Sequence, residues 1–342
     1  MASESSNFDI SGPLHLTHVN WDNPYNRKSV AASLVQGAYI LEEDRQKQRE
    51  GSNALAPRWW TFFHFQLLHT LVDDVGNSIF GAIYEFKPPS SMYNNTLHRG
   101  PRYVIAFRGT MIKVSSFMRD IRLDLKLLKN GLHRTSRSKI AIEAVKNTVV
   151  SVGSSNLWLA GHSLGSGMAL LAGKTMAKNG VFIETFLFNP PYAYAPVARI
   201  RNRKWKRRIK FAGSMLTAGF AIAMKDKKNS TFDSFVALPN WIPCLFVNPH
   251  DYICSGYVEY FEQRRKMEEI GAGSIEKIAT QNSVVSLMMS ALFDKDSEPM
   301  HVIPSANVTE NLTPQQNFIE AHRLNQWWKP DLHLESKLYK YQ

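Results

Sequence analysis

A serine between two glycines is the first residue whose surroundings could support chemistry. Residues 161–165 read Gly-His-Ser-Leu-Gly, which fits the G-x-S-x-G pattern around Ser163. An apolar run precedes it at 157–160, and apolar residues follow it at helical spacing from 168 to 177. This order predicts a strand, a sharp turn and a helix, which is the context that a nucleophile elbow needs. Ser163 is then expected at the tip of a strained turn with its hydroxyl exposed.

The predicted helix directly after Ser163 supplies an electrostatic feature. Its first turn carries N–H groups without helical partners, and its dipole places partial positive charge at the same end. A negative oxygen forming beside Ser163 would be stabilised there. The amide of Leu164 is the predicted donor.

A nucleophilic serine needs a base, and the base needs an orienting acid. In α/β-hydrolases the acid lies after the serine in the chain, in the loop past a strand. Asp251 follows the apolar run 244–247 directly, whereas Asp226 and Asp233 do not follow a strand. Asp294 and Asp296 fall in a charged connector. We therefore favour Asp251, with a turn-capping role as the alternative.

The base is expected after the acid, which leaves His301, His322 and His333. His322 lies in the segment after the last predicted strand, where the hydrolase histidine belongs, and we favour it. His301 is the next choice, and His333 lies close to the end of the sequence. His162 and His250 are neighbours of proposed catalytic residues, and adjacent side chains diverge. Both are therefore expected to be structural.

A second oxyanion donor is expected on the loop after the strand beside the elbow strand. Arg108, Gly109 and Thr110 follow the apolar run 103–107 and occupy that place. The amide or the hydroxyl of Thr110 could donate. The alternative is an ordinary turn at the end of a strand.

The elements that must position these residues alternate between strands and helices. Helices are predicted at 26–50, 116–128, 139–150, 255–270 and 274–293, and strands at 79–86, 103–107, 182–188, 244–247 and from 302. The aromatic cluster 59–63 is expected to pack in the core. This alternation indicates an α/β fold with a mostly parallel sheet and helices on both faces. Residues 1–25 are expected to be loosely ordered, and residues 26–342 to form one domain.

The net charge of +12 is concentrated in one stretch. Eight cationic side chains and no acidic one lie between Arg199 and Lys210, and the uncharged apolar segment 211–224 follows. A local patch argues against a surface that coats nucleic acid. We treat 199–228 as an insert that could touch anionic membranes. A buried helix with a solvated basic flank is the alternative.

Targeting and cofactor signals are sparse. Residues 1–10 carry neither a basic nor an apolar signal region, so a cytoplasmic location with peripheral membrane contact is expected. Cys244 and Cys254 are too few for a disulfide framework, and their separation matches no zinc pattern. No metal or organic cofactor is expected.

Taken as a set, these motifs resemble the class 3, fungal-lipase-like lipases of the α/β-hydrolase superfamily. The matching stretches are FRGT at 107–110, GHSLG at 161–165 and the aspartate at 251. FNPPYAY, FVNPHDYIC, IPSAN and AHRLNQWW look like a plant subfamily that sometimes carries the label GDSL esterase/lipase. No GDS-type motif lies near the N-terminus. Two departures are the Gly-Ser-Gly order at 165–167 and the long separation between serine and acid.

The resemblance implies hydrolysis of acyl esters of lipid type. The triad would be Ser163, Asp251 and His322, with Thr110 and Leu164 as oxyanion donors. The resembling group also includes regulators that keep the fold and act as binding proteins. A non-catalytic binding protein is therefore the alternative hypothesis.

Overall fold

The structure is a computed structural model of the 342-residue chain, and it describes residues 8–74, 76–89, 100–111, 135–192, 237–269 and 303–341. Some expectations lie outside these residues. They are the helices predicted at 116–128 and 274–293, the insert 199–228 with its membrane hypothesis, and His301. The single-domain organisation also stays a prediction.

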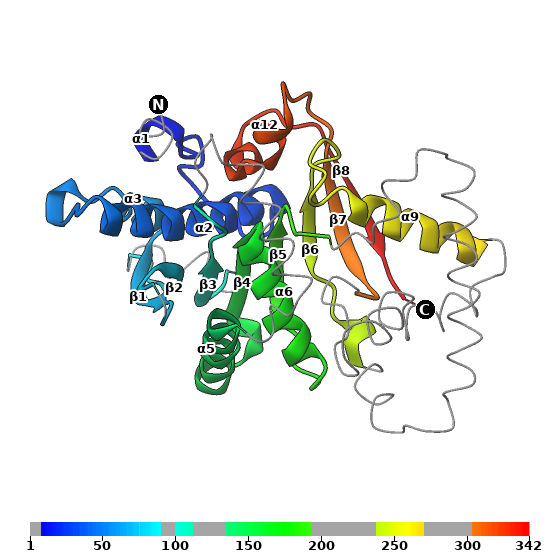
Figure 1. The fold of residues 1–342 in the computed structure, drawn as a ribbon, viewed down its shortest axis with the longest axis horizontal. Helices are drawn as coiled ribbons and strands as arrows, with labels where there is room; N and C mark the ends of the chain where they lie inside the picture. Colours follow the sequence, from blue (N-terminus) through cyan, green and yellow to red (C-terminus); the bar gives the residue numbers. More distant parts are fainter. Residues whose placement is uncertain are drawn as a thin grey trace.

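Strands of the described residues form one eight-stranded sheet (Figure 1). They are β1 (Phe65–Val72), β2 (Ile79–Phe86), β3 (Tyr103–Phe107), β4 (Leu157–His162), β5 (Glu184–Phe188), β6 (Cys244–Val247), β7 (Ala306–Asn311) and β8 (Leu334–Tyr339). The strands lie side by side in chain order. β3 to β7 pair in parallel, while β1–β2, β2–β3 and β7–β8 pair antiparallel. The predicted α/β class with a parallel central sheet is confirmed.

Helices flank this sheet. They are α1 (Phe8–Ser11), α2 (Pro24–Gln46), α3 (Arg58–Thr61), α5 (Ser136–Val152), α6 (Leu164–Ala177), α9 (Gly256–Glu269) and α12 (Phe318–His322), with the 3₁₀ turns η2 (Gly51–Asn53), η5 (Ser154–Asn156), η7 (Leu238–Asn240) and η8 (Leu324–Trp328). The helix predicted from residue 26 is α2, which Asn23 caps by accepting from the amide of Tyr25. Thr135 caps α5 in the same way, accepting from Ser138.

Connection handedness explains which helices cover which face. Crossovers between parallel strands are almost always right-handed, so strands that follow one another in order place their crossover helices on one side. α5, α6 and α9 bury Val145, Met168 and Phe261 in a single core with Ile105 and Leu159 of the sheet. The opposite face of the sheet is covered by segments other than these crossover helices.

The second core is closed by segments near the two ends of the described chain. Residues of α2, α3 and η8 pack there against Val104, Trp158 and Phe186 of the sheet. Trp59, Trp60 and Trp327 belong to this core, so the expectation that the aromatic cluster is packing is confirmed. Helices on both faces are confirmed as well.

The expectation of a loosely ordered N-terminal segment does not hold for residues 8–25. Phe8, Leu16 and Trp21 are buried in the second core. The indole N–H of Trp328 donates to the carbonyl of Ser11 at 2.7 Å. The physical reason is that the described crossover helices, α5, α6 and α9, pack on the other face, so apolar residues near the N-terminus help to cover this one.

Three strands differ from the sequence expectation. β1 and β8 were not predicted, and the strand expected from residue 302 begins at Ala306 instead. β1 and β8 are the edge strands, and most of their residues are exposed or half-buried, so neither carries the apolar run of a central strand. Pro304 precedes the true start of β7, where a turn suits a residue without an N–H.

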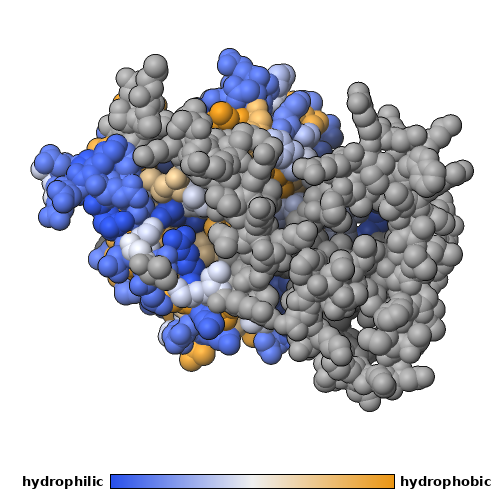
Figure 2. All heavy atoms as spheres, viewed as in Figure 1, coloured by the Kyte–Doolittle hydropathy of each residue, from blue (hydrophilic) through white to orange (hydrophobic). Residues whose placement is uncertain are grey.

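The described surface is mostly hydrophilic on the face drawn in Figure 2, and hydrophobic residues are scattered over it in small groups. Within the described ranges, the structure contains no helix with the length and hydropathy that a membrane span requires.

Candidate active site

Ser163 joins β4 to α6 in a backbone conformation that few residues adopt. Its φ is +55° and its ψ is −124°, and its amide donates to the carbonyl of Phe188 at 3.0 Å. Close contact between strand and helix requires glycine on both sides. A Cβ at Gly161 would lie 2.4 Å from the carbonyl oxygen of Gly165, and one at Gly165 would lie 2.2 Å from that of Phe107. The structure therefore has the predicted strained turn.

The Gly-Ser-Gly departure at 165–167 has a local explanation. Ser166 is fully buried, and its Oγ lies 2.6 Å from the carbonyl oxygen of Gly161 and 2.8 Å from that of Phe188. The hydroxyl thus donates between the ends of β4 and β5. A second glycine at this position would lose that link.

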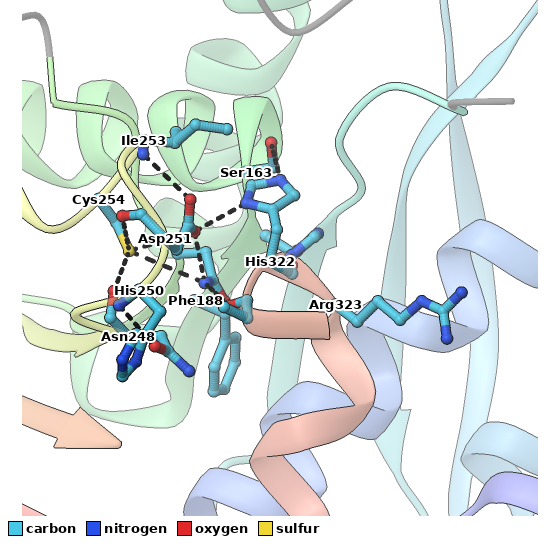
Figure 3. Close-up of polar contacts among 12 residues, drawn as sticks. Ser163, Phe188, Asn248, His250, Asp251, Ile253, Cys254, His322 and Arg323 are labelled. Atoms are coloured by element: carbon cyan, nitrogen blue, oxygen red, sulfur yellow. Dashed lines mark hydrogen bonds and ion pairs between the residues drawn. The ribbon is translucent and has the colours of Figure 1, made fainter. Parts of the chain in front are cut away.

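Asp251 lies in the turn directly after β6, as predicted, and is fully buried. Its amide donates to the carbonyl of Asn248, and its Oδ1 accepts from the amide of Ile253 at 3.0 Å. The carboxylate is therefore held by its own turn and points toward α12 (Figure 3).

His322 is the last residue of α12, and its ring lies between Asp251 and Ser163 (Figure 3). Nδ1 is 2.8 Å from Asp251 Oδ2, and Nε2 is 3.1 Å from Ser163 Oγ. A carboxylate accepts only, so Nδ1 donates to Asp251, and Nε2 faces the serine hydroxyl, from which it can accept. The structure thus brings together the three residues that the sequence favoured.

Ser163 is buried, contrary to the expectation of an exposed hydroxyl. Two neighbours account for this. The ring of His322 lies over Oγ, and the loop after β3 passes beside Cβ, because a Cβ at Gly109 would lie only 3.0 Å from that of Ser163.

The loop at 108–110 follows β3 where the sequence analysis placed the second oxyanion donor. Arg108 anchors it, donating to the carbonyls of Ile79 and Gly109 and to the hydroxyl of Ser78, each at 2.6 Å. Thr110 follows Gly109 in this loop. On the other side of Ser163, Leu164 begins α6. Both predicted donors therefore come from segments next to the serine.

His162 connects two parts of the site. Its Nε2 donates to the backbone carbonyl of His322 at 2.8 Å, and its Nδ1 accepts from the hydroxyl of Tyr39, also at 2.8 Å. The Tyr39 oxygen accepts in turn from the amide of Gly109. Burial lowers the pKa of His162 to about 3, so the ring stays neutral. His250 is exposed and points away from this arrangement.

Sequence reasoning did not identify Tyr39 or Asn189. Asn189 lies directly after β5, and its Nδ2 donates to Asp251 Oδ2 at 2.7 Å. The position of Asn189 in the sequence could have indicated it. Parallel strands end at one edge of the sheet, so the residues that follow β3, β4, β5 and β6 must lie close together there. Tyr39 lies on α2 and has no such signal.

Metal ligands do not gather in the part of the chain that the structure describes, since no three His, Cys, Asp or Glu side chains lie close enough there to hold an ion. Cys244 and Cys254 are both free, and burial raises the pKa of the Cys244 thiol to about 12.

The α/β-hydrolase class is defined by a parallel central sheet and by three residues in a fixed order along the chain. A serine lies in an elbow after one strand, an acid follows a later strand, and a histidine comes after the acid. This chain has that sheet and that order. The family description "Lipase (class 3)" matches residues 104–210. An Arabidopsis thaliana protein named a GDSL esterase/lipase is 49% identical over 353 residues, covering 100% of this chain and 99% of that protein. The chain belongs to this family of class 3 lipases and is a carboxylic ester hydrolase.

Solved structures of fungal lipases are less similar to this chain in sequence than the Arabidopsis protein is. A lipase from Rhizopus microsporus var. chinensis is 12% identical, with a TM-score of 0.35, over 67% of each chain. A Rhizomucor miehei lipase in complex with its propeptide is also 12% identical, with a TM-score of 0.36, over 67% of this chain and 60% of that one.

Proposed function

We propose that the chain hydrolyses lipid-like acyl esters by serine catalysis, with Ser163 as nucleophile, His322 as base and Asp251 as orienting acid. One observation carries the proposal. Hydrogen bonds run from Ser163 Oγ through the His322 ring to Asp251, with lengths of 3.1 and 2.8 Å. Base and nucleophile are within the range that proton transfer needs.

In the proposed acylation step, Ser163 Oγ attacks the carbonyl carbon of the ester and its proton moves to His322 Nε2. Asp251 stabilises the imidazolium and does not take the proton. The bond to the alcohol oxygen then breaks, and His322 returns the proton to that oxygen. Water attacks the acyl-enzyme by the same route, which releases the acid and restores the serine hydroxyl.

The negative oxygen of the tetrahedral intermediate would be held from two sides. The amide of Leu164 lies at the start of α6, where helix N–H groups lack helical partners. Thr110 would supply the second donor from the loop that Arg108 anchors. Donors held by the start of α6 and by the anchored loop would need little reorganisation when charge develops.

A fluorophosphonate probe tests this proposal, because it modifies only an activated serine. The native chain should be labelled at Ser163 and should hydrolyse a p-nitrophenyl acyl ester. Ser163→Ala should abolish labelling. Ser163→Ala, Asp251→Asn and His322→Ala should each lower kcat by about three orders of magnitude or more, with folding intact.

His250→Ala is the matched control, because His250 is a neighbour of Asp251 in sequence but is exposed outside the site. It should keep native activity. Near-native activity in Ser163→Ala would overturn the mechanism. Loss of activity in His301→Ala with normal turnover in His322→Ala would overturn the assignment of the base. A folded chain that takes no label and hydrolyses no ester would favour the binding-protein alternative.

Location and membrane contact stay predictions. We propose a cytoplasmic protein that touches anionic membranes through Arg199–Lys210. Eight cations without an acid in that stretch support the idea, since each contributes about 1 kcal/mol near an anionic surface.

A further inference from the structure

Asn189 lies where three neighbouring strands end. In the register of the sheet, His162 is opposite Phe188 and Phe188 is opposite Phe246. The next residue of β5 therefore lies between the serine turn after β4 and the acid turn after β6. Asn189 is fully buried, and its amide donates to the carbonyl of Phe246 at 2.9 Å. Its φ of +48° is a conformation that asparagine tolerates better than most residues.

The side-chain amide of Asn189 has a partner in each direction. Nδ2 donates to Asp251 Oδ2 at 2.7 Å and to the carbonyl of Ala321 at 3.0 Å. Oδ1 accepts from the indole N–H of Trp327 at 2.7 Å. An indole only donates, while a carboxylate and a carbonyl only accept, so the orientation of the amide is determined. Asn189 Nδ2 also lies 3.8 Å from Cys254 Sγ.

These partners belong to different parts of the site. Asp251 Oδ2 is the same oxygen that accepts from His322 Nδ1, and Ala321 is the residue before His322. A single amide thus links the acid to the backbone that carries the base. Trp327 lies in η8 and packs against Phe188 and Phe246, which fixes the indole.

We infer that Asn189, held by Trp327, is a positioning residue that fixes Asp251 and His322 relative to each other. This inference rests on the proposed function. Asn189 touches neither Ser163 nor a substrate, so it acts through the acid and the histidine. A displacement of about 1 Å between reacting groups can cost a factor of about 100 in rate, which is the scale of the expected effect.

A charge effect accompanies the geometric one. The titratable groups that face Asp251 are His322, His162 and the thiol of Cys254. When the N–H of Asn189 is removed, Asp251 Oδ2 loses one of its donors, so the carboxylate interacts more strongly with positive charge on the neighbouring ring. A role confined to packing gives no such change.

The experiment measures fluorophosphonate labelling and ester hydrolysis across pH for Asn189→Ala, Asn189→Asp and Trp327→Phe. We expect kcat and the labelling rate to fall by about 10- to 100-fold in both Asn189 variants, with KM close to native. The pH at which kcat/KM reaches half its maximum should be higher in Asn189→Ala than in the native chain. Trp327→Phe keeps the aromatic packing and should show a smaller change in the same direction.

Asn26→Ala is the matched control. Asn26 is also buried, but it lies on α2 and its Oδ1 accepts from the amide of Asn20. Its variant should keep the native pH profile. Native labelling and an unchanged pH profile in folded Asn189→Ala would overturn the inference. If neither Asn189 variant folds, native behaviour of Trp327→Phe would overturn it. Absence of labelling in the native chain itself would instead overturn the proposed function.

Discussion

The backbone conformation of Ser163 is strained by about 1–3 kcal/mol, and contacts with its neighbours hold it in place. Its amide bonds to the carbonyl of Phe188, and the hydroxyl of Ser166 links the ends of β4 and β5. Glycines at 161 and 165 allow strand and helix to approach within distances that any side chain would prevent. The strain is therefore carried by the surrounding fold.

Thr110 provides the prediction at this scale. Thr110→Val removes the hydroxyl and keeps the amide. We expect kcat to fall by up to about 100-fold with little change in KM, because an oxyanion donor acts mainly in the transition state. Steady-state kinetics on the p-nitrophenyl ester measure this. Thr148→Val on α5, which loses a bond to the Ala144 carbonyl far from the serine, should be normal. A native kcat in Thr110→Val would exclude the hydroxyl as donor and leave either the amide or no role for Thr110 in the oxyanion site.

The triad candidates could be predicted from the sequence, and Asn189 has a signal in its position after a parallel strand, but the hydrogen-bond partners of Tyr39 and Asn189 could not be predicted. Ser163, Asp251 and His322 each follow a recognisable strand or motif in a fixed order along the chain. Tyr39 and Asn189 act through hydrogen bonds to residues 123 and 62 positions away. The pair of Asn189 depends on how the strands align, and the pair of Tyr39 depends on how α2 packs on the sheet. Sequence patterns reveal neither.

Among the elements, α2 carries an unusual buried charge. Lys28 is 2% exposed, and its Nζ has no hydrogen-bond partner among the described residues. It lies 4.4 Å from the centre of the Tyr25 ring. Burial lowers the pKa of Lys28 from 10.5 to about 7. Between these two values the unfolded chain binds more protons at this residue than the folded chain, so Lys28 makes stability increase with pH.

Lys28→Met should therefore be more stable than the native chain at pH 7. The difference in unfolding free energy should shrink by up to about 1.4 kcal/mol per pH unit between pH 7 and pH 10, because the neutral amine is no longer penalised. Urea unfolding at several pH values gives this difference. Lys146→Met on α5, where the side chain is exposed, should show no such trend. A pH-independent difference for Lys28→Met would contradict the prediction.

Elements were predictable from sequence where both faces are buried, and were missed where they are not. The runs that became β2 to β6 are mostly apolar and mostly buried. β8 reads LESKLY and is mostly exposed, so pairing with β7 rather than its own pattern makes it a strand. The same reason accounts for β1, which pairs only with β2.

At the scale of the whole molecule, the two faces of the sheet are built by different parts of the chain. Crossover helices cover one face, while α2, α3, η8 and residues near the N-terminus cover the other. Phe8 packs edge-on against Trp59, and Trp59 packs against Trp328. Segments from the two ends of the described chain thus depend on each other.

Phe8→Ala tests that dependence. Removing this fully buried ring should lower the free energy of unfolding by about 3–5 kcal/mol, through lost burial and the cavity left behind. Ile10→Ala, two residues away and 66% exposed, should change it by less than about 0.5 kcal/mol. Thermal and urea unfolding measure both. Equal stability of the two variants would mean that the segment does not contribute to the second core.

The order of the strands also sets a sequence of events during synthesis. Because neighbours in the sheet are neighbours in the chain, each new strand can join an edge that already exists. The serine turn and Asn189 are made early, whereas His322 and Trp327 are made after seven of the eight strands. Until these residues are synthesised, Phe188 and Phe246 lack the indole of Trp327, and Ser163 lacks its base, His322. The incomplete chain therefore exposes apolar surface and lacks a complete triad. The segment that carries His322 and Trp327 covers that surface and completes the triad at the same time.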